Sequence, residues 1–262
     1  MLYIVAVPIG NADDLSPRAA ETLRTADLIL CEDTRTSFPL LKRHGIETPL
    51  KSYHKFNERE RAEDIAELLR GGSNIALISD AGTPCVSDPG AVLTAAAVAE
   101  GVSVSAVPGP CAAIAALSIS GFNAASFVFR GFLPRKKGQL AKVISTTLTE
   151  PSPVTIFYES PLRIITSAAC MADEIPDSRV CLCNDLTKPH ERVYRGTPKQ
   201  ILEELQANRN ASKGEYTIVI ARSVIKPISG DCGNYERKRY DKDQTYPRFH
   251  RRDRALGYKT EF

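Results

Sequence analysis

The strongest constraint on the fold is a repeated alternation of short apolar runs with amphipathic, helix-like stretches in the first half of the chain. Residues 3–7, 28–31 and 74–79 are rich in Val, Ile and Leu, and each run ends in a turn that precedes a helix-like pattern. Parallel strands need a long crossover between them, and that crossover is usually a helix. The alternation therefore predicts an α/β protein with mainly parallel strands in its first half.

Local signals at the predicted helix ends agree with this pattern. Ser16-Pro17 combines an N-cap residue with a proline at the first helical position, and Gly45 is typical of the residue that follows a helix. Asn57-Glu58-Arg59-Glu60 resembles a capping box. Ser87-Asp88-Pro89 indicates a further helix start.

The pattern resets near residues 121–125, where we place a domain boundary. The second half predicts strands at residues 127–129, 154–158, 179–183 and 216–221, with helices near 139–148, 162–172 and 198–207. We therefore expect α/β domains at residues 1–122 and 123–222. Beyond them, residues 223–262 form a predicted basic tail with little fixed structure, because residues 235–262 hold nine Lys/Arg against five Asp/Glu and few large apolar side chains.

Composition excludes several classes of protein. A chain with 43% hydrophobic and 25% charged residues is typical of a globular protein. It contains no run of about 18 apolar residues, so no membrane span is expected. The seven cysteines form no C-x-x-C pair, and the four histidines lack metal-ligand spacing beside them. We expect reduced cysteines, a cytoplasmic location and no metal site.

Three strand-to-helix turns carry the first signs of a binding site. They are Pro8-Ile9-Gly10-Asn11, Asp80-Ala81-Gly82-Thr83-Pro84 and Pro108-Gly109-Pro110-Cys111-Ala112. Ligands of open α/β sheets bind at the carboxyl ends of the strands, and Gly and Pro let the backbone approach a ligand closely. Each turn alone could be only a tight turn, but three turns at one edge predict a ligand site.

The turn at Asp80 limits the kind of ligand. A carboxylate suits hydroxyl groups or a positive centre and would repel a phosphate. No phosphate-binding G-x-x-x-x-G-K-[ST] run occurs, and no G-x-G-x-x-G follows the first strand. These features disfavour a phosphate-cradling nucleotide fold and leave room for a cofactor with a sulfonium and an amino-acid tail.

Other polar groups follow the remaining strands. Glu32-Asp33-Thr34-Arg35 could supply a general base and a phosphate ligand, or it could only cap a helix. Phe157-Tyr158-Glu159-Ser160-Pro161 and Asn184-Asp185-Leu186-Thr187-Lys188 stand at strand ends in the second half. Gly131-Phe132-Leu133-Pro134-Arg135-Lys136-Lys137 places basic residues beside an aromatic ring, which suits RNA or, equally, a solvated face.

Taken in order, these motifs and residues 2–11, 79–90 and 186–188 resemble one family over residues 2–222. The chain is similar to the ribosomal RNA small subunit methyltransferase I family of the tetrapyrrole methylase superfamily. This resemblance implies two α/β domains with S-adenosylmethionine in the cleft between them, and a homodimer. It also implies 2′-O-methylation of a cytidine ribose in the decoding region of 16S rRNA, within the small ribosomal subunit.

The resemblance also implies roles for individual residues. Glu32, Asp33 and Arg35 would face the substrate. The residues expected to contact the cofactor are Pro8, Gly10, Asp80, Ala81, Gly82, Thr83, Cys111, Ala112, Tyr158 and Leu186. A ribose hydroxyl is a weak nucleophile, so we expect Glu32, Asp33 or Glu159 to help remove its proton, with Arg35 and residues 135–137 holding phosphates.

Two alternatives remain open. A tetrapyrrole C-methyltransferase would share the cofactor motifs, and only the turn at residues 32–35 and the basic segment at residues 131–137 argue against it. A non-enzymatic RNA-binding factor on the same fold is the other alternative. It is kept open by departures from the family pattern at Cys85, Asn184 and Asp185.

Overall fold

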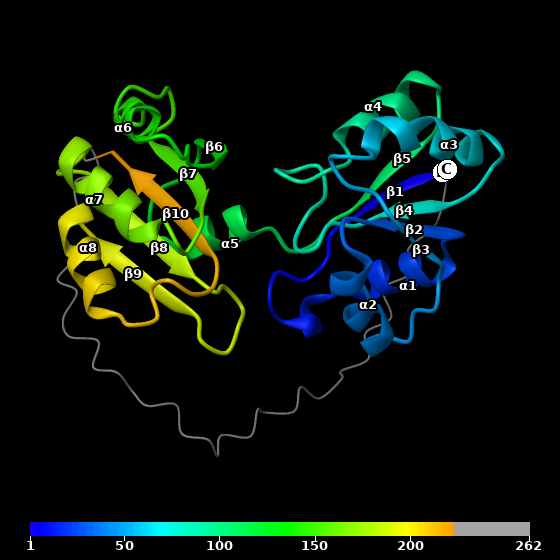
Figure 1. Cartoon of the computed structure of the whole chain (residues 1–262), viewed down its shortest axis with the longest axis horizontal. Helices are drawn as coiled ribbons and strands as arrows, with labels where there is room; N and C mark the ends of the chain where they lie inside the picture. Colours follow the sequence, from blue (N-terminus) through cyan, green and yellow to red (C-terminus); the bar gives the residue numbers. More distant parts are fainter. Residues whose placement is uncertain (223–262) are drawn as a thin grey trace, which may run out of the picture. The chain divides into compact units, whose positions relative to one another are not determined.

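The computed structural model describes residues 1–222, without the side chains of Arg59 and Ala62. The predicted tail at residues 223–262 lies outside the described residues. Two five-stranded sheets, each with its own helices, make up the described part (Figure 1). The α/β fold class is therefore confirmed.

The first sheet is entirely parallel, in the order β3-β2-β4-β1-β5. Its strands are β1 (Leu2–Val5), β2 (Leu28–Cys31), β3 (Leu50–Ser52), β4 (Ile75–Leu77) and β5 (Val104–Val107). Because every strand runs the same way, all five carboxyl ends fall on one edge, as the alternating pattern predicts.

Helices cover both faces of the first sheet. They are α1 (Pro17–Thr25), α2 (Thr34–Arg43), α3 (Glu58–Arg70) and α4 (Ala91–Ala99), with a short 3₁₀ turn, η1 (Ala12–Asp14). Leu23 of α1 and Leu41 of α2 pack with Val5 and Ile29 on one face. Apolar side chains of α3 and α4, such as Ile65 and Leu93, pack with Leu2, Leu30 and Leu77 on the other.

The second sheet is mixed, in the order β6-β7-β10-β8-β9. β6 and β7 are parallel, and the remaining neighbours are antiparallel. Its strands are β6 (Phe127–Phe132), β7 (Val154–Glu159), β8 (Arg179–Asn184), β9 (Arg192–Gly196) and β10 (Tyr216–Ala221).

The helices of the second sheet come from two parts of the chain. On one face lie α6 (Lys137–Thr146), α7 (Ile164–Glu174) and α8 (Pro198–Ala207), whose buried side chains join those of β7, β8 and β10. On the other face lies α5 (Ala112–Ile119), which precedes the expected boundary at residue 122. The boundary itself stays a prediction, but α5 packs against the second sheet.

The sequence predicted some helix starts correctly and others wrongly. The Ser16 hydroxyl accepts a hydrogen bond from the Ala19 amide as the predicted N-cap of α1. The capping box expected at Asn57 does not form. The Asn57 side chain instead accepts from the His54 amide, so it is turned away from the helix. The helix predicted to start at Ser87 begins later, after its N-cap residue Gly90. The φ of 123° at Gly90 lies outside the helical range.

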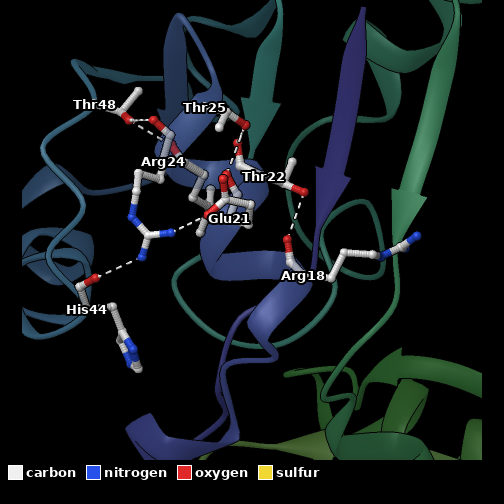
Figure 2. A network of polar contacts seen from close by, with 8 residues as sticks. Arg18, Glu21, Thr22, Arg24, Thr25, His44 and Thr48 are labelled. Carbon is white, nitrogen blue, oxygen red and sulfur yellow. Dashed lines mark hydrogen bonds and ion pairs between the residues drawn. The ribbon is translucent and has the colours of Figure 1, made fainter.

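The end of α1 shows how orphan carbonyl groups are satisfied. The Thr48 hydroxyl donates to the Leu23 and Arg24 carbonyls at 2.7 and 3.3 Å. The Arg24 guanidinium pairs with Glu21 and donates to the His44 carbonyl (Figure 2). The last carbonyls of a helix lack intrahelical partners. Thr48 therefore satisfies two carbonyls at the end of α1, and Arg24 joins that end to His44, the C-cap of α2.

One close approach connects the first turn to the loop after β8. A Cβ atom added at Gly10 would lie 2.5 Å from the Lys188 Cγ, and 2.8 Å from both the Leu186 carbonyl oxygen and the Thr187 hydroxyl. The Asn11 amide donates to that same hydroxyl at 3.0 Å. Glycine at position 10 is therefore required for the two segments to meet.

We predict that Gly10→Ala lowers the free energy of unfolding by about 1–3 kcal/mol, because the added methyl group overpacks a contact with backbone on one side. Urea unfolding followed by circular dichroism measures this change. Gly138→Ala is the matched control, because a Cβ there meets nothing within 4 Å. It should stabilise the protein by up to about 1 kcal/mol. Equal effects of the two substitutions would contradict the role assigned to Gly10.

Candidate functional site

The three Gly/Pro turns meet at the carboxyl edge of the first sheet. Val7 and Gly82 exchange two backbone hydrogen bonds of 2.9 and 3.0 Å. The Thr83 hydroxyl donates to the Pro110 carbonyl at 3.0 Å. Gly82 has a φ of +80°, which an L side chain rarely adopts. The turns expected to converge are thus tied together by hydrogen bonds.

A cavity of about 410 Å³ opens beside these turns. Its walls come from the loop of residues 80–88, the start of α5, and the ends of β6, β7 and β10. Such a volume is typical of small-molecule sites. Of the residues expected to contact a cofactor, the following line it: Asp80, Ala81, Gly82, Thr83, Cys111, Ala112, Tyr158 and Leu186.

The other two expected cofactor residues lie in a neighbouring hollow. Pro8 and Gly10 line a second cavity of about 260 Å³, together with Thr36 and Ser37 of α2. Ile9, Asp80 and Ala81 line both cavities. The two hollows are therefore adjacent, and the loop at Asp80 separates them.

Acidic groups gather near the larger cavity. Burial, together with the negative charges of Glu32 and Asp80, raises the pKa of Asp88 to about 6, against the opposing charge of Lys55. Burial and Asp80 likewise raise the pKa of Glu32, against Lys55 and His54. Partial desolvation raises the pKa of Asp80. These three carboxylates make the region favourable for a cation.

Asp33 is a helix cap paired with an arginine. Its carboxylate accepts from the Arg35 amide at 2.8 Å and from the Arg35 guanidinium at 2.7 Å. These bonds lower the pKa of Asp33 to about 2, which makes it a weak proton acceptor. Its own amide donates to the Asp80 carboxylate at 3.1 Å, so the cap also orients the cavity loop.

Glu159 is buried and fully engaged. Its carboxylate contacts the Arg163 guanidinium and accepts from the Ser160 amide and the Ser167 hydroxyl. Three donors from within the fold therefore occupy this carboxylate. The geometry favours a structural function for Glu159 at the end of β7.

Tyr158, next to Glu159, joins the second sheet to α5. Its hydroxyl accepts a hydrogen bond from the Ala113 amide at 3.2 Å, one of the unpaired donors at the start of that helix. Burial raises the pKa of the Tyr158 hydroxyl, so it stays neutral. Its ring forms part of the apolar wall of the cavity.

The loop after β8 carries an internal charge network. Lys188 donates to Asp185 and to Glu215, both at 2.9 Å, and the Asn184 amide group donates to the Lys213 and Glu215 carbonyls. Asp185 is therefore paired within the fold. Of these residues, Glu215 lines both cavities.

Several site residues were not among the expected ones. In the sequence, Asp88 belongs to the predicted helix start at residues 87–89 and to the family-like segment at residues 79–90, without a predicted role in the site. Lys55 follows β3, a three-residue strand that the apolar pattern does not reveal. Glu215 depends on the pairing of β10 with β8, which places it beside Lys188. Only Asp88 had a local signal, namely a carboxylate between two turn residues close to the Asp80 loop.

The residues present fit S-adenosylmethionine. Unpaired carboxylates at Asp80 and Asp88 suit its positive groups, while Ile9, Tyr158 and Leu186 offer apolar surface for a flat ring. Within residues 1–222, no grouping of His, Cys, Asp and Glu could hold a metal ion. None of the described helices combines the length and hydropathy needed to cross a bilayer.

Comparison with known proteins places the chain in a family. The model of the Tetrapyrrole (Corrin/Porphyrin) Methylases matches residues 1–202. A Pseudomonas aeruginosa protein named ribosomal RNA small subunit methyltransferase I is 42% identical over 84% of this chain and 78% of its own length. Its namesake from Thermotoga maritima is 38% identical over 84% of this chain and 97% of its own length. A protein of the same name from Xylella fastidiosa is 44% identical over 84% of this chain and 80% of its own length.

Solved structures share the fold at low identity. Diphthine synthase matches with a TM-score of 0.65 and 16% identity over 84% of this chain and 89% of that one. Uroporphyrin-III-C-methyltransferase from Thermus thermophilus matches with a TM-score of 0.58 and 17% identity, over 85% and 94%. The chain therefore belongs to the tetrapyrrole methylase family and, within it, to the ribosomal RNA small subunit methyltransferase I family.

Proposed function

We propose that this protein transfers the methyl group of S-adenosylmethionine to the 2′-hydroxyl of a cytidine ribose in the decoding region of 16S rRNA. It acts in the cytoplasm, as a homodimer, on the small ribosomal subunit. Family membership supports the methyltransferase class. The observation that carries the proposal is the cavity lined by residues from both sheets and their loops, which combines two carboxylates without an ion-pair partner in residues 1–222, Asp80 and Asp88, with several apolar side chains.

Asp88 and Asp80 hold the positive groups of the cofactor in this proposal. Both line the cavity, and no ion pair in residues 1–222 neutralises either of them. The backbone of residues 80–84 supplies hydrogen bonds, and Leu186 and Tyr158 contact the flat ring. When bound, S-adenosylmethionine supplies a methyl group on a positively charged sulfur. The contribution of the protein is chiefly to position the two reactants.

Glu32 is the proton acceptor in this proposal. Of the three acids expected to act, Asp33 is paired with Arg35 and Glu159 is held by Arg163. Glu32 takes part in no ion pair in the described part of the chain and has a raised pKa, which suits a general base. Arg35, whose side chain is 88% exposed, remains free on its outer side to contact a phosphate.

The direct test of the function uses small ribosomal subunits from cells that lack this protein. With methyl-labelled cofactor, we expect one cytidine of 16S rRNA to gain a 2′-O-methyl group. Labelling of uroporphyrinogen instead would support a tetrapyrrole methyltransferase. Absence of cofactor binding in calorimetry would support a non-enzymatic RNA-binding factor.

We predict that Glu32→Gln slows single-turnover methyl transfer by about 10²- to 10⁴-fold, because it removes the proton acceptor while keeping the size of the side chain. The matched control is Asp33→Asn, which alters the neighbouring acid. It should slow transfer by less than about 10-fold and lower stability by about 1 kcal/mol through the weakened cap. A wild-type rate in Glu32→Gln would exclude Glu32 as the acceptor.

A second prediction concerns the dependence of stability on pH. Because burial raises the pKa of Asp88 to about 6, the folded state binds its proton more tightly than the unfolded chain does. Its stabilising contribution is therefore complete below the ordinary pKa of 3.8 and is lost as pH rises through about 6. Asp88→Asn should raise the urea midpoint relative to wild type at about pH 8, and the difference should vanish at about pH 4.

The same residue predicts how cofactor affinity depends on pH. Because the ionised Asp88 carboxylate attracts a cation, affinity measured by calorimetry should increase as pH rises through about 6 in wild type. It should be nearly independent of pH in Asp88→Asn over this range. An identical pH dependence in both proteins would show that Asp88 does not face the positive group.

A further inference from the structure

The strand β6 contains one extra residue relative to its neighbour β7. Phe129 lies opposite Ile156, and Phe132 lies opposite Tyr158. Three positions along β6 therefore correspond to two along β7. Such a bulge redirects the side chains that follow it, and bulges are frequent next to active sites.

The bulge decides which way Phe132 faces. In a regular strand, Phe129 and Phe132 would point to opposite faces because side chains alternate. With the extra residue, both rings lie on the face of Tyr158, at centroid distances of 4.9 and 5.5 Å from its ring. Gly131, with a φ of +66°, allows this turn, and a Cβ there would lie 3.2 Å from the Ser87 hydroxyl.

Phe132 consequently stands at the cavity with much of its ring uncovered. It lines the cavity, yet it is 60% exposed. Its contact with Tyr158 is edge-on, and the Tyr158 hydroxyl is itself held by the Ala113 amide. A bulge that turns a large apolar ring out of the sheet and towards a ligand cavity is not explained by core packing.

The residues that follow Phe132 add positive charge. Leu133 is buried, and its amide donates to the Tyr158 carbonyl at 3.1 Å, which fixes the strand end. Arg135, Lys136 and Lys137 are exposed, and none of them takes part in an ion pair within residues 1–222. An exposed aromatic ring at a fixed strand end thus precedes three solvent-facing cations by only a few positions.

We propose that Phe132 is a stacking platform for the base of the nucleotide that is methylated, with residues 135–137 holding the adjoining phosphates. This inference rests on the proposed function and deepens it. Sequence-specific RNA recognition uses unstacked bases laid on aromatic side chains. The base of the target must leave its neighbours for its ribose to reach a cavity in the protein, and a phenyl face offers it a new stacking partner.

The decisive experiment compares substitutions of Phe132 in single-turnover methyl transfer to small ribosomal subunits. Loss of a base-stacking ring costs about 5- to 100-fold in RNA binding. Phe132→Leu, which keeps apolar packing against Tyr158 but removes the aromatic face, should reduce kcat/KM for the subunits by that factor. Phe132→Trp should retain at least half of the wild-type value. Cofactor affinity by calorimetry should change by less than about twofold in both variants.

Phe127→Leu is the matched control. Phe127 lies on the same strand, is also exposed (39%), and does not line the cavity. It should leave kcat/KM unchanged. Circular dichroism melts of all variants show whether each one is folded. If the Phe132 and Phe127 variants both lose activity because both are less well folded, the inference is overturned.

Other results would overturn it in different ways. A parallel loss of cofactor affinity in Phe132→Leu would show that the ring contacts the adenine of the cofactor. An unchanged kcat/KM together with an unchanged cofactor affinity in Phe132→Leu would show that the ring contacts neither ligand. In both cases the wild-type protein still methylates the subunits. If the wild type itself fails to methylate them, it is the proposed function that is wrong.

Discussion

The site depends on the two hydrogen bonds between Val7 and Gly82 at the end of the first sheet. Parallel strands bring their carboxyl ends to one edge but leave the loops beyond them independent. These two bonds join the loop after β1 to the loop after β4, and the Thr83 hydroxyl extends the connection to Pro110, directly ahead of α5. Since α5 packs on the second sheet, the same connection fixes where the cavity walls from both sheets meet.

The negative charge near the cavity comes from the carboxylates that have no cationic partner within the described part of the fold. Asp33, Glu159 and Asp185 each have a cationic partner within the fold, so their negative charges are balanced locally. Glu32, Asp80 and Asp88 have raised pKa values because burial and mutual repulsion disfavour their charged forms. A group that is costly to ionise in the free protein becomes favourable once a cation lies beside it. The unpaired set is therefore suited to a sulfonium or an ammonium group.

Much of the fold was predictable because its signals are local. The strands β2 and β10 and the helix α8 have the predicted bounds, since apolar runs and an N-cap with proline act within a few residues. The signal failed where a distant partner decides the structure. Asn57 accepts a hydrogen bond from the His54 amide instead of capping α3. The short strand β3 is defined by its pairing with β2. The pairing of β8 with β10 brings Lys188 beside Glu215. The bulge in β6 likewise needs β7 to define it.

Backbone strain marks the same loops from both sheets. Within residues 1–222, four non-glycine residues have left-handed φ values between 52° and 70°, namely Cys85, Ser87, Asp185 and Thr187. Two of them lie in the loop of residues 80–90 and two in the loop after β8. Each such conformation costs about 1–3 kcal/mol and persists only where surrounding contacts enforce it. Both loops contribute residues to the cavity, Ser87 from the first and Leu186 from the second, so the strained backbone lies in segments that border it. A cation that contacts these loops offsets the cost of the unpaired negative charges directly, and contacts that hold the loops in place compensate the cost of the strained backbone.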